Sequence, residues 1–180
     1  MKSKFIIPVL ILFFISFEIV QAQQPGKSRN LAAGVAIPAG NFSETHLIGA
    51  EVMIDYSPNR FGKLLRFPDP SIGFVLSGGI SYFAGKKETV STYPYRYGNY
   101  AILRVYGGAI LHLAKNWNTR LVAGPAISYY GNNIRFNLGA ELQSTWYWKQ
   151  QWGVGPTLGI LKENGADPLL MSGIRIAYAF

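Results

Sequence analysis

The stretch Leu169-Leu-Met-Ser-Gly-Ile-Arg-Ile-Ala-Tyr-Ala-Phe180 decides the fold class of this chain. Every second residue from Leu170 to Phe180 is mostly bulky and apolar, and the residues between them are small apart from Arg175 and Met171. Because side chains alternate across a β-strand, this pattern gives one face that suits lipid and one that suits a narrow interior. The stretch therefore predicts a closing strand that ends on an aromatic residue.

Seven earlier segments show the same alternation, most clearly residues 134–148, where apolar side chains alternate with polar side chains and Gly. The predicted strands cover residues 31–37, 47–57, 71–83, 100–114, 117–130, 134–148 and 152–162. With the closing strand this makes eight, the smallest even number typical of single-chain bacterial barrels. The sequence thus predicts an all-β fold, an eight-stranded antiparallel up-and-down transmembrane β-barrel. Pro125 and Pro156 each predict a local bulge or a weak hydrogen-bond pair, because Pro lacks the N–H donor.

The composition agrees with many alternating strands. Hydrophobic residues make up 49% of the chain, yet no segment after residue 22 is a long continuous apolar run, which excludes transmembrane helices. The net charge of +8 comes from Lys and Arg residues scattered singly, without the clustered footprint that nucleic-acid binding requires. Contact with anionic lipid headgroups explains the charge more simply, so we expect outer-membrane lipids and no nucleic acid as partners.

The N-terminal segment predicts export. Lys2 and Lys4 precede an apolar run over residues 5–17, and Val20-Gln21-Ala22 offers small residues at the usual cleavage spacing. The run is too short for a bilayer span of about 20 helical residues, so it predicts a signal peptide and not an anchor. We therefore expect residues 1–22 to be a signal peptide and residues 23–180 to form one barrel domain. The chain has no Cys, which excludes both disulfides and a lipid-modified N-terminal Cys.

The connections predict the orientation. The N-terminus starts in the periplasm, so odd-numbered connections should face outward and the short turns at residues 115–116 and 149–151 should face the periplasm. The longest outer loop runs from Ala84 to Asn99, and the connection over residues 58–70 is long for a periplasmic turn. Within the loop, we single out a candidate recognition surface for an extracellular ligand or protein, since exposed Tyr and Arg are favoured in binding sites: Tyr93, Tyr95, Arg96 and Tyr97. The alternative is an aromatic girdle at the headgroup level.

Two motifs carry a resemblance to a known family. Gly34-Val-Ala-Ile-Pro-Ala-Gly-Asn-Phe42 and the C-terminal Phe180 resemble the porin-like superfamily of small outer-membrane β-barrel proteins, related in architecture to OmpA and OmpX. The resemblance implies the outer membrane of a Gram-negative bacterium, and it implies that the barrel-assembly machinery reads Phe180 as an assembly signal. Neither motif specifies an activity, because one fold carries many functions.

Seven charged residues point inward in the predicted register: Glu51, Asp55, Arg104, Arg120, Arg135, Glu141 and Arg175. Since eight strands leave room only for side chains, they predict an interior plugged by ion pairs. The small residues of the first strand leave space for Arg175 to cross toward Glu51 or Asp55. The alternative is a small anion-preferring pore, because four Arg stand against three carboxylates.

The sequence gives no catalytic, metal-binding or cofactor-binding residues. His46 and His112 are the only His, and Ser43-Glu44-Thr45-His46 has the pattern of a solvated turn. The primary hypothesis is a non-enzymatic integral outer-membrane protein with a structural or adhesive role through its outer loops. One rival is a lipid A-modifying barrel enzyme, since small enzymes that resemble this fold use Ser with His near the lipid boundary. A soluble, lipocalin-like exported carrier is a second rival.

Overall fold

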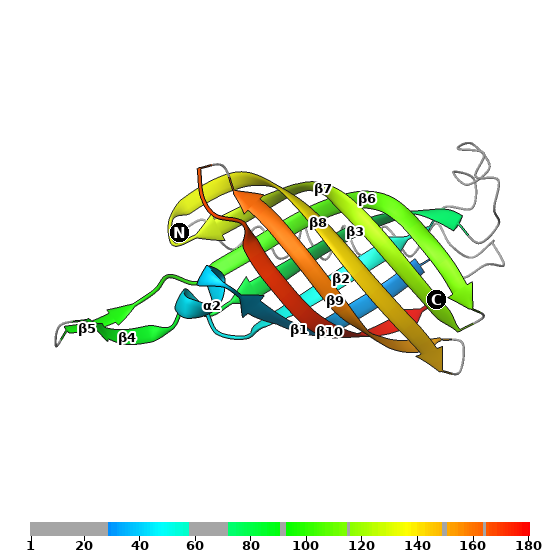
Figure 1. Cartoon of the computed structure of the whole chain (residues 1–180), viewed down its shortest axis with the longest axis horizontal. Coiled ribbons are helices and arrows are strands. Elements are labelled where there is room, and N and C mark those ends of the chain that lie inside the picture. The colour runs from blue at the N-terminus through cyan, green and yellow to red at the C-terminus, as the bar shows by residue number, and fades with distance from the viewer. Residues whose placement is uncertain (1–28, 58–71, 91–92, 115, 149–150, 164) are drawn as a thin grey trace, which may run out of the picture.

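The computed structural model describes residues 29–57, 72–90, 93–114, 116–148, 151–163 and 165–180. The long strands are β1 (Arg29–Ala39), β2 (Gly49–Tyr56), β3 (Ile72–Phe83), β6 (Tyr100–Ala114), β7 (Trp117–Tyr130), β8 (Asn133–Trp148), β9 (Trp152–Glu163) and β10 (Leu169–Ala179). They form one closed barrel, in the order β1-β10-β9-β8-β7-β6-β3-β2, with every pair antiparallel (Figure 1). The predicted fold class is confirmed.

The closing strand pairs with the first strand along its length. β10 and β1 stay in register from Asn30 opposite Ala179 to Ala39 opposite Leu170. The backbone N–H of Phe180 then donates to the carbonyl of Arg29 over 3.0 Å, so the last residue is tied to the first described one. This closure leaves the barrel without a free edge, which protects such sheets from pairing with other chains.

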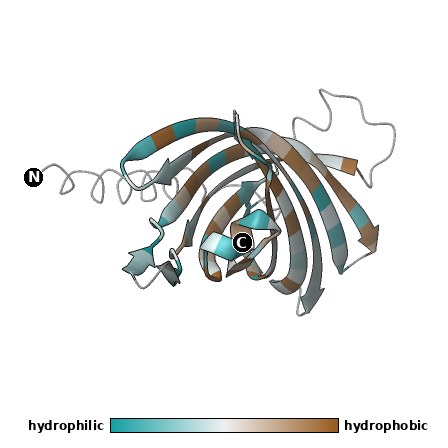
Figure 2. Ribbon diagram, turned by 60° about the vertical axis from the view of Figure 1, so that its left-hand side comes forward, coloured by the Kyte–Doolittle hydropathy of each residue, from teal (hydrophilic) through white to brown (hydrophobic). Residues whose placement is uncertain are grey.

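The two faces of the sheet separate by chemistry, as the alternation predicted. Figure 2 shows bands of opposite hydropathy alternating along the strands. Outward side chains are exposed and largely apolar, and many inward side chains are buried. The outward face near the C-terminal end carries an aromatic band over β7 to β10, made of Trp117, Trp146, Trp148, Trp152, Tyr178 and Phe180. Trp and Tyr favour a membrane–water boundary, and the band has the position expected of one girdle.

Pro125 and Pro156 each interrupt the hydrogen-bonded pairing of neighbouring strands without changing the strand register. The pairing of β6 with β7 stops at Arg104 opposite Ala126 and resumes at Gly107 opposite Ala123, on either side of Pro125. The pairing of β8 with β9 shows the same gap around Pro156, and the register is unchanged across both gaps. The weak pair predicted at each Pro is therefore confirmed, and neither position forms a bulge.

Three short elements lie at the end of the barrel opposite the C-terminus (Figure 1). The helix α2 (Asn41–Thr45) follows β1, and β4 (Lys87–Val90) pairs with β5 (Tyr93–Arg96) in a hairpin inside the long loop. The expected solvated turn over residues 43–46 is wrong, because residues 43–45 belong to α2 and His46, which follows the helix, is buried. The expected signal peptide over residues 1–22 and the connection over residues 58–70 lie outside the described residues.

Among the residues that the structure describes, no helix is long and apolar enough to cross a membrane.

Candidate functional site

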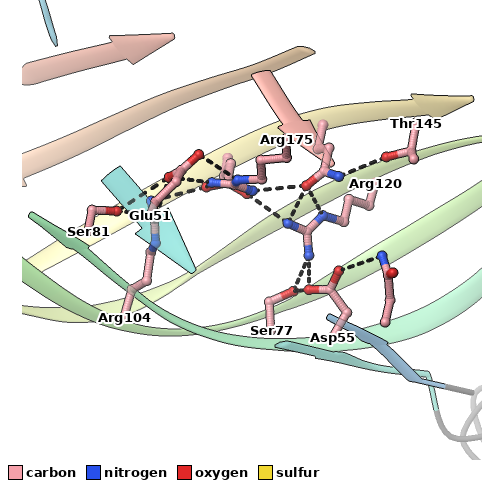
Figure 3. A network of polar contacts seen from close by, with 11 residues as sticks. Glu51, Asp55, Ser77, Ser81, Arg104, Arg120, Thr145 and Arg175 are labelled. Atoms are coloured by element: carbon pink, nitrogen blue, oxygen red, sulfur yellow. Dashed lines mark hydrogen bonds and ion pairs between the residues drawn. The ribbon is translucent and has the colours of Figure 1, made fainter. Parts of the chain in front are cut away.

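Arg175 lies at the centre of a charged network inside the barrel (Figure 3). Its side chain, 1% exposed, reaches across from β10 to Glu51 on β2 and to Glu141 on β8. The Nε atom donates to Glu51 Oε1 over 2.6 Å, and Nη2 donates to Glu51 Oε2 over 2.8 Å and to Glu141 Oε2 over 2.7 Å. One guanidinium therefore holds two carboxylates, as the fork of donors in Arg allows.

Gly34 makes this crossing possible. In the sheet it stands directly opposite Arg175 on one side and Glu51 on the other. A Cβ atom at Gly34 would lie 2.8 Å from Cγ of Arg175 and 2.2 Å from the carbonyl oxygen of Ile174. The space that Arg175 occupies is thus the space that a side chain at position 34 would fill.

Glu141 joins the rest of the network. It accepts from Arg104 Nη1 over 3.1 Å and from Arg120 Nη2 over 2.9 Å, in addition to Arg175. Arg104 also donates to Glu51, and Arg120 pairs with Asp55. Of the two partners predicted for Arg175, the structure therefore places Glu51 against it, while Asp55 is held by Arg120. Ser77, Ser81, Gln143 and Thr145 add further hydrogen bonds to this network.

Arg135 stands apart from the other predicted interior charges. Its side chain is 47% exposed, and it pairs over 2.7 Å with Glu163, near the end of the barrel that carries the hairpin. Glu163 is buried and also accepts hydrogen bonds from the hydroxyls of Tyr100 and Ser128. Glu163 is not among the predicted interior charges because it lies one residue beyond the predicted strand over residues 152–162, although it continues the inward-facing alternation of β9.

Including Glu163 balances the inward charges. Four guanidiniums now face four carboxylates: Arg104, Arg120, Arg135 and Arg175 against Glu51, Asp55, Glu141 and Glu163. The excess of Arg that favoured an anion-preferring pore is absent from this set. Each buried charge has an opposite charge within hydrogen-bonding distance, which is what makes its burial tolerable.

The segment after β1 folds into the mouth of the barrel. Phe42 of α2 is buried against Phe83 and Tyr100, with ring centroids 5.0 and 5.3 Å away. His46 packs beside it, and its Nε2–H donates to the carbonyl of Gly98 over 3.2 Å, so Nδ1 accepts from the Thr45 hydroxyl over 2.8 Å. Burial lowers the pKa of the His46 imidazole from its usual value of 6.5, and the hydrogen bond to Gly98 opposes that shift.

The same segment ties down the base of the hairpin. The backbone N–H of Lys86 donates to the Thr45 carbonyl over 2.9 Å, and the N–H of Leu47 donates to the Ala84 carbonyl over 2.9 Å. The Lys86 ammonium donates to the carbonyl of Ser43 over 2.5 Å. With the His46–Gly98 bond, these contacts fix where the hairpin leaves the barrel.

The hairpin has two unlike faces. Tyr93, Tyr95 and Tyr97 lie on one face, where Tyr93 is 77% exposed, Tyr95 is 50% exposed, and the Tyr97 hydroxyl donates to Glu88 over 3.2 Å. Arg96 alternates to the opposite face, where it stands directly across from Lys87. The predicted recognition surface is therefore not one patch, because the structure brings the three Tyr together and separates Arg96 from them.

Groups that could bind a metal ion do not occur among the described residues, since no three His, Cys, Asp or Glu side chains gather in one place. His112 lies exposed near the end of β6, at the opposite end of the barrel from His46. Phe180, the predicted assembly signal, is half-exposed and stacks on Tyr178 with ring centroids 6.3 Å apart.

Neither a protein-family model nor a curated protein matches the sequence. Solved structures match the fold. Ail, the attachment invasion locus protein of Yersinia pestis, superposes with a TM-score of 0.53 at 9% identity, over 84% of this chain and 96% of Ail. The outer-membrane enzyme PagL superposes with a TM-score of 0.56 at 9% identity, over 84% of this chain and 99% of PagL. The N-terminal β-barrel domain of Pseudomonas aeruginosa OprF gives 0.50 at 12% identity, over 87% and 100%.

These similarities establish that the chain has the fold of the small outer-membrane β-barrels. At such low identity they establish the fold alone, because an attachment protein and an enzyme share it equally. The features specific to this chain are the interior network, the segment that folds into the barrel mouth, and the hairpin.

Proposed function

We propose that this chain is a non-enzymatic integral protein of the Gram-negative outer membrane, whose barrel is a closed anchor and whose long loop performs recognition or adhesion. The observation that carries the proposal is the pairing of two features. The interior is filled by paired charges, and the β4–β5 hairpin is fixed at its base while its faces stay exposed. Pre-ordering a binding element lowers the entropy that binding costs.

The apolar exterior supports the membrane location. Its exposed Leu, Ile and Val side chains would be costly to leave in water over a whole barrel wall, and they are inexpensive against lipid. The aromatic band near the C-terminus supports a boundary at that end, and the Phe180 side chain is open to the assembly machinery. The predicted signal peptide accounts for export.

Two observations support a closed, non-catalytic barrel over its rivals. Both ring nitrogens of His46 are occupied by Thr45 and Gly98, so neither is free to act on a substrate. The central guanidiniums are shared between carboxylates and do not present an open lining for anions. The fold itself does not decide this point, since PagL is an enzyme and Ail has been solved in complex with the heparin analogue sucrose octasulfate.

The test combines location and adhesion. Membrane fractionation with a heat-modifiability gel should place the protein in the outer membrane. Its intact mass should match that of a chain beginning at Gln23. Replacing residues 87–96 by two Gly, which joins the fixed base at Lys86 and Tyr97, should abolish adhesion of the cells to host-type surfaces while the gel shift stays normal. The lipid A mass spectrum of a deletion strain should be unchanged. Adhesion that survives the replacement refutes the recognition role, and altered lipid A favours the enzyme.

A further inference from the structure

Two like charges face each other across the hairpin. Lys87 and Arg96 are directly opposite in the register of β4 and β5, and both are exposed. Among the described residues, neither has a carboxylate partner. Like charges directly opposite one another destabilise an antiparallel pair. The arrangement therefore weakens the hairpin, so the two cations are not explained by a contribution to its stability.

The hairpin geometry brings these two cations close together. Pro94 stands opposite Thr89 and has no N–H, so this pair cannot be of the hydrogen-bonded type. Pair types alternate along the ladder, which makes Lys87 and Arg96 a non-hydrogen-bonded pair as well. The N–H of Tyr97 donates to the Lys86 carbonyl over 3.0 Å, which agrees with a hydrogen-bonded pair next to it. Opposite Cα atoms in non-hydrogen-bonded pairs are only about 4.5 Å apart.

The nearby acid does not neutralise this face. Glu88 lies on the opposite face of the hairpin and accepts a hydrogen bond from the Tyr97 hydroxyl. The next cation, Lys86, is occupied with the carbonyl of Ser43. The cationic face thus consists of Lys87, Arg96 and, two pairs further along the ladder, Thr89 opposite Pro94.

We propose that Lys87 and Arg96 form a clamp for the sulfate or phosphate ester groups of an extracellular glycan. The guanidinium of Arg96 offers a planar pair of donors that matches such an oxyanion. The ammonium group of Lys87, on the opposite strand, adds a second positive charge. A bound anion between them replaces repulsion by two attractions. The hairpin extends away from the end of the barrel (Figure 1), so the clamp faces ligands outside the cell in preference to lipid phosphates at the barrel wall.

This inference rests on the proposed recognition role of the hairpin, and it specifies the ligand class. The competing explanation is that the two cations only keep the edges of the hairpin from pairing with other strands, a common use of exposed Lys. That explanation requires no ligand and predicts no dependence on sulfate. The two explanations therefore differ in a binding measurement.

The experiment uses the full-length mature protein in nanodiscs and an immobilised heparin oligosaccharide, with the same oligosaccharide after desulfation as the comparison. We expect binding to the sulfated form only, and we expect it to weaken with added salt. Lys87→Gln and Arg96→Gln should each weaken binding about two- to fivefold, and the double variant about tenfold or more, as for exposed ion pairs. Lys162→Gln, which removes an exposed cation on β9, is the matched control and should bind as wild type.

Several outcomes would overturn the clamp. These are wild-type affinity in the double variant, an equal loss in Lys162→Gln, or equal binding to the desulfated form. A loss caused by Tyr93→Ser and not by the cationic variants would assign recognition to the aromatic face instead. If wild type binds no sulfated glycan while replacement of residues 87–96 still abolishes adhesion, the clamp fails and the recognition role stands. If that replacement leaves adhesion intact, the recognition role itself fails.

Discussion

The barrel interior and the β4–β5 hairpin both contain Arg side chains, but these are buried and paired in the interior and, among the described residues, exposed and unpaired with any carboxylate on the hairpin. Arg175 is 1% exposed and is held by two carboxylates, whereas Arg96 is exposed and stands opposite another cation. A buried charge has to be paired because desolvation is expensive, so the interior Arg side chains are needed to stabilise the fold. An exposed charge is screened by water, so it needs no partner within the protein and can bind a ligand. The surroundings of these residues, and not their type, distinguish the structural role of Arg175 from the binding role that we propose for Arg96.

The largest effect should follow from removing Arg175. Arg175→Ala leaves Glu51 and Glu141 buried with fewer partners, and breaking one side of a buried pair costs about 3–5 kcal/mol. The free energy of unfolding should fall by that amount, and the urea midpoint measured by gel mobility should fall with it. Glu88→Gln, which changes an exposed charge on the hairpin, should leave the midpoint unchanged.

The same variant separates the closed anchor from the pore. If the interior charges serve to fill the barrel, Arg175→Ala should remain close to non-conducting in planar bilayers. If Arg175 lined a working pore, stability would stay near that of wild type and the anion current would change. An unchanged midpoint together with an altered current would refute the closed-barrel interpretation.

A smaller loss of stability should come from filling the space beside Arg175. Gly34→Ala introduces a Cβ atom that would lie 2.2 Å from the Ile174 carbonyl oxygen and 2.8 Å from Arg175 Cγ. Overpacking of this kind costs about 1–3 kcal/mol. Gly107→Ala is the matched control, because its Cβ would meet Leu76 at an ordinary 3.5 Å. Equal urea midpoints for the two variants would show that Arg175 does not need the space at Gly34.

The sequence predicted the barrel well, because one physical rule acts along every long strand. Lipid on one side and a narrow interior on the other enforce a period of two, which predicted the bounds of β6 and β7 to the residue. The small residues of the first strand predicted that Arg175 would cross toward Glu51 or Asp55, and Arg175 pairs with Glu51. The period of two also accounts for Glu163, which lies two positions beyond the inward-facing Leu161 and one residue beyond the predicted strand over residues 152–162.

The hairpin end was predicted poorly, because no such rule acts on its loops. The burial of Phe42 and His46 depends on contacts with Phe83, Tyr100 and Gly98, which are distant in the sequence. Which Arg meets which carboxylate likewise depends on three-dimensional reach across the barrel. The separation of Arg96 from the Tyr residues could have been seen from alternation, had residues 93–96 been recognised as a strand.

His46 lies between the two regions and should respond to pH. Its pKa is lowered while the ring is buried in the barrel mouth, so His46 binds the proton more readily when the segment over residues 40–48 unfolds from the mouth. The folded segment is therefore fully stabilised above the ordinary pKa of 6.5 and loses stability as the pH falls below it. Hydrogen exchange of the amides at 40–48 and 84–90, corrected for intrinsic rates, should be faster at pH 5.0 than at pH 7.5.

Two variants locate the origin of that response. His46→Phe keeps an aromatic ring beside Phe42 and removes the titrating group, so it should abolish the pH dependence. His112→Gln, at the opposite end of the barrel, should retain it. A pH dependence that persists in His46→Phe would assign the effect to another group.

The smallest effect distinguishes the two explanations of the cationic hairpin face. Lys87→Glu places a carboxylate opposite Arg96, and a favourable cross-strand pair contributes about 0.2–1 kcal/mol. Amide protection at residues 87–90 and 93–97 should rise slightly, the urea midpoint of the barrel should not change, and binding to the sulfated oligosaccharide should be lost. Lys87→Gln removes the like charge without adding an attraction, so it should raise protection by less than Lys87→Glu. If Lys87→Glu leaves protection unchanged, the repulsion between Lys87 and Arg96 is negligible in water, and a bound anion would relieve nothing. If protection rises while binding is lost, the two cations lower the local stability of the wild-type hairpin and are required to bind the anion.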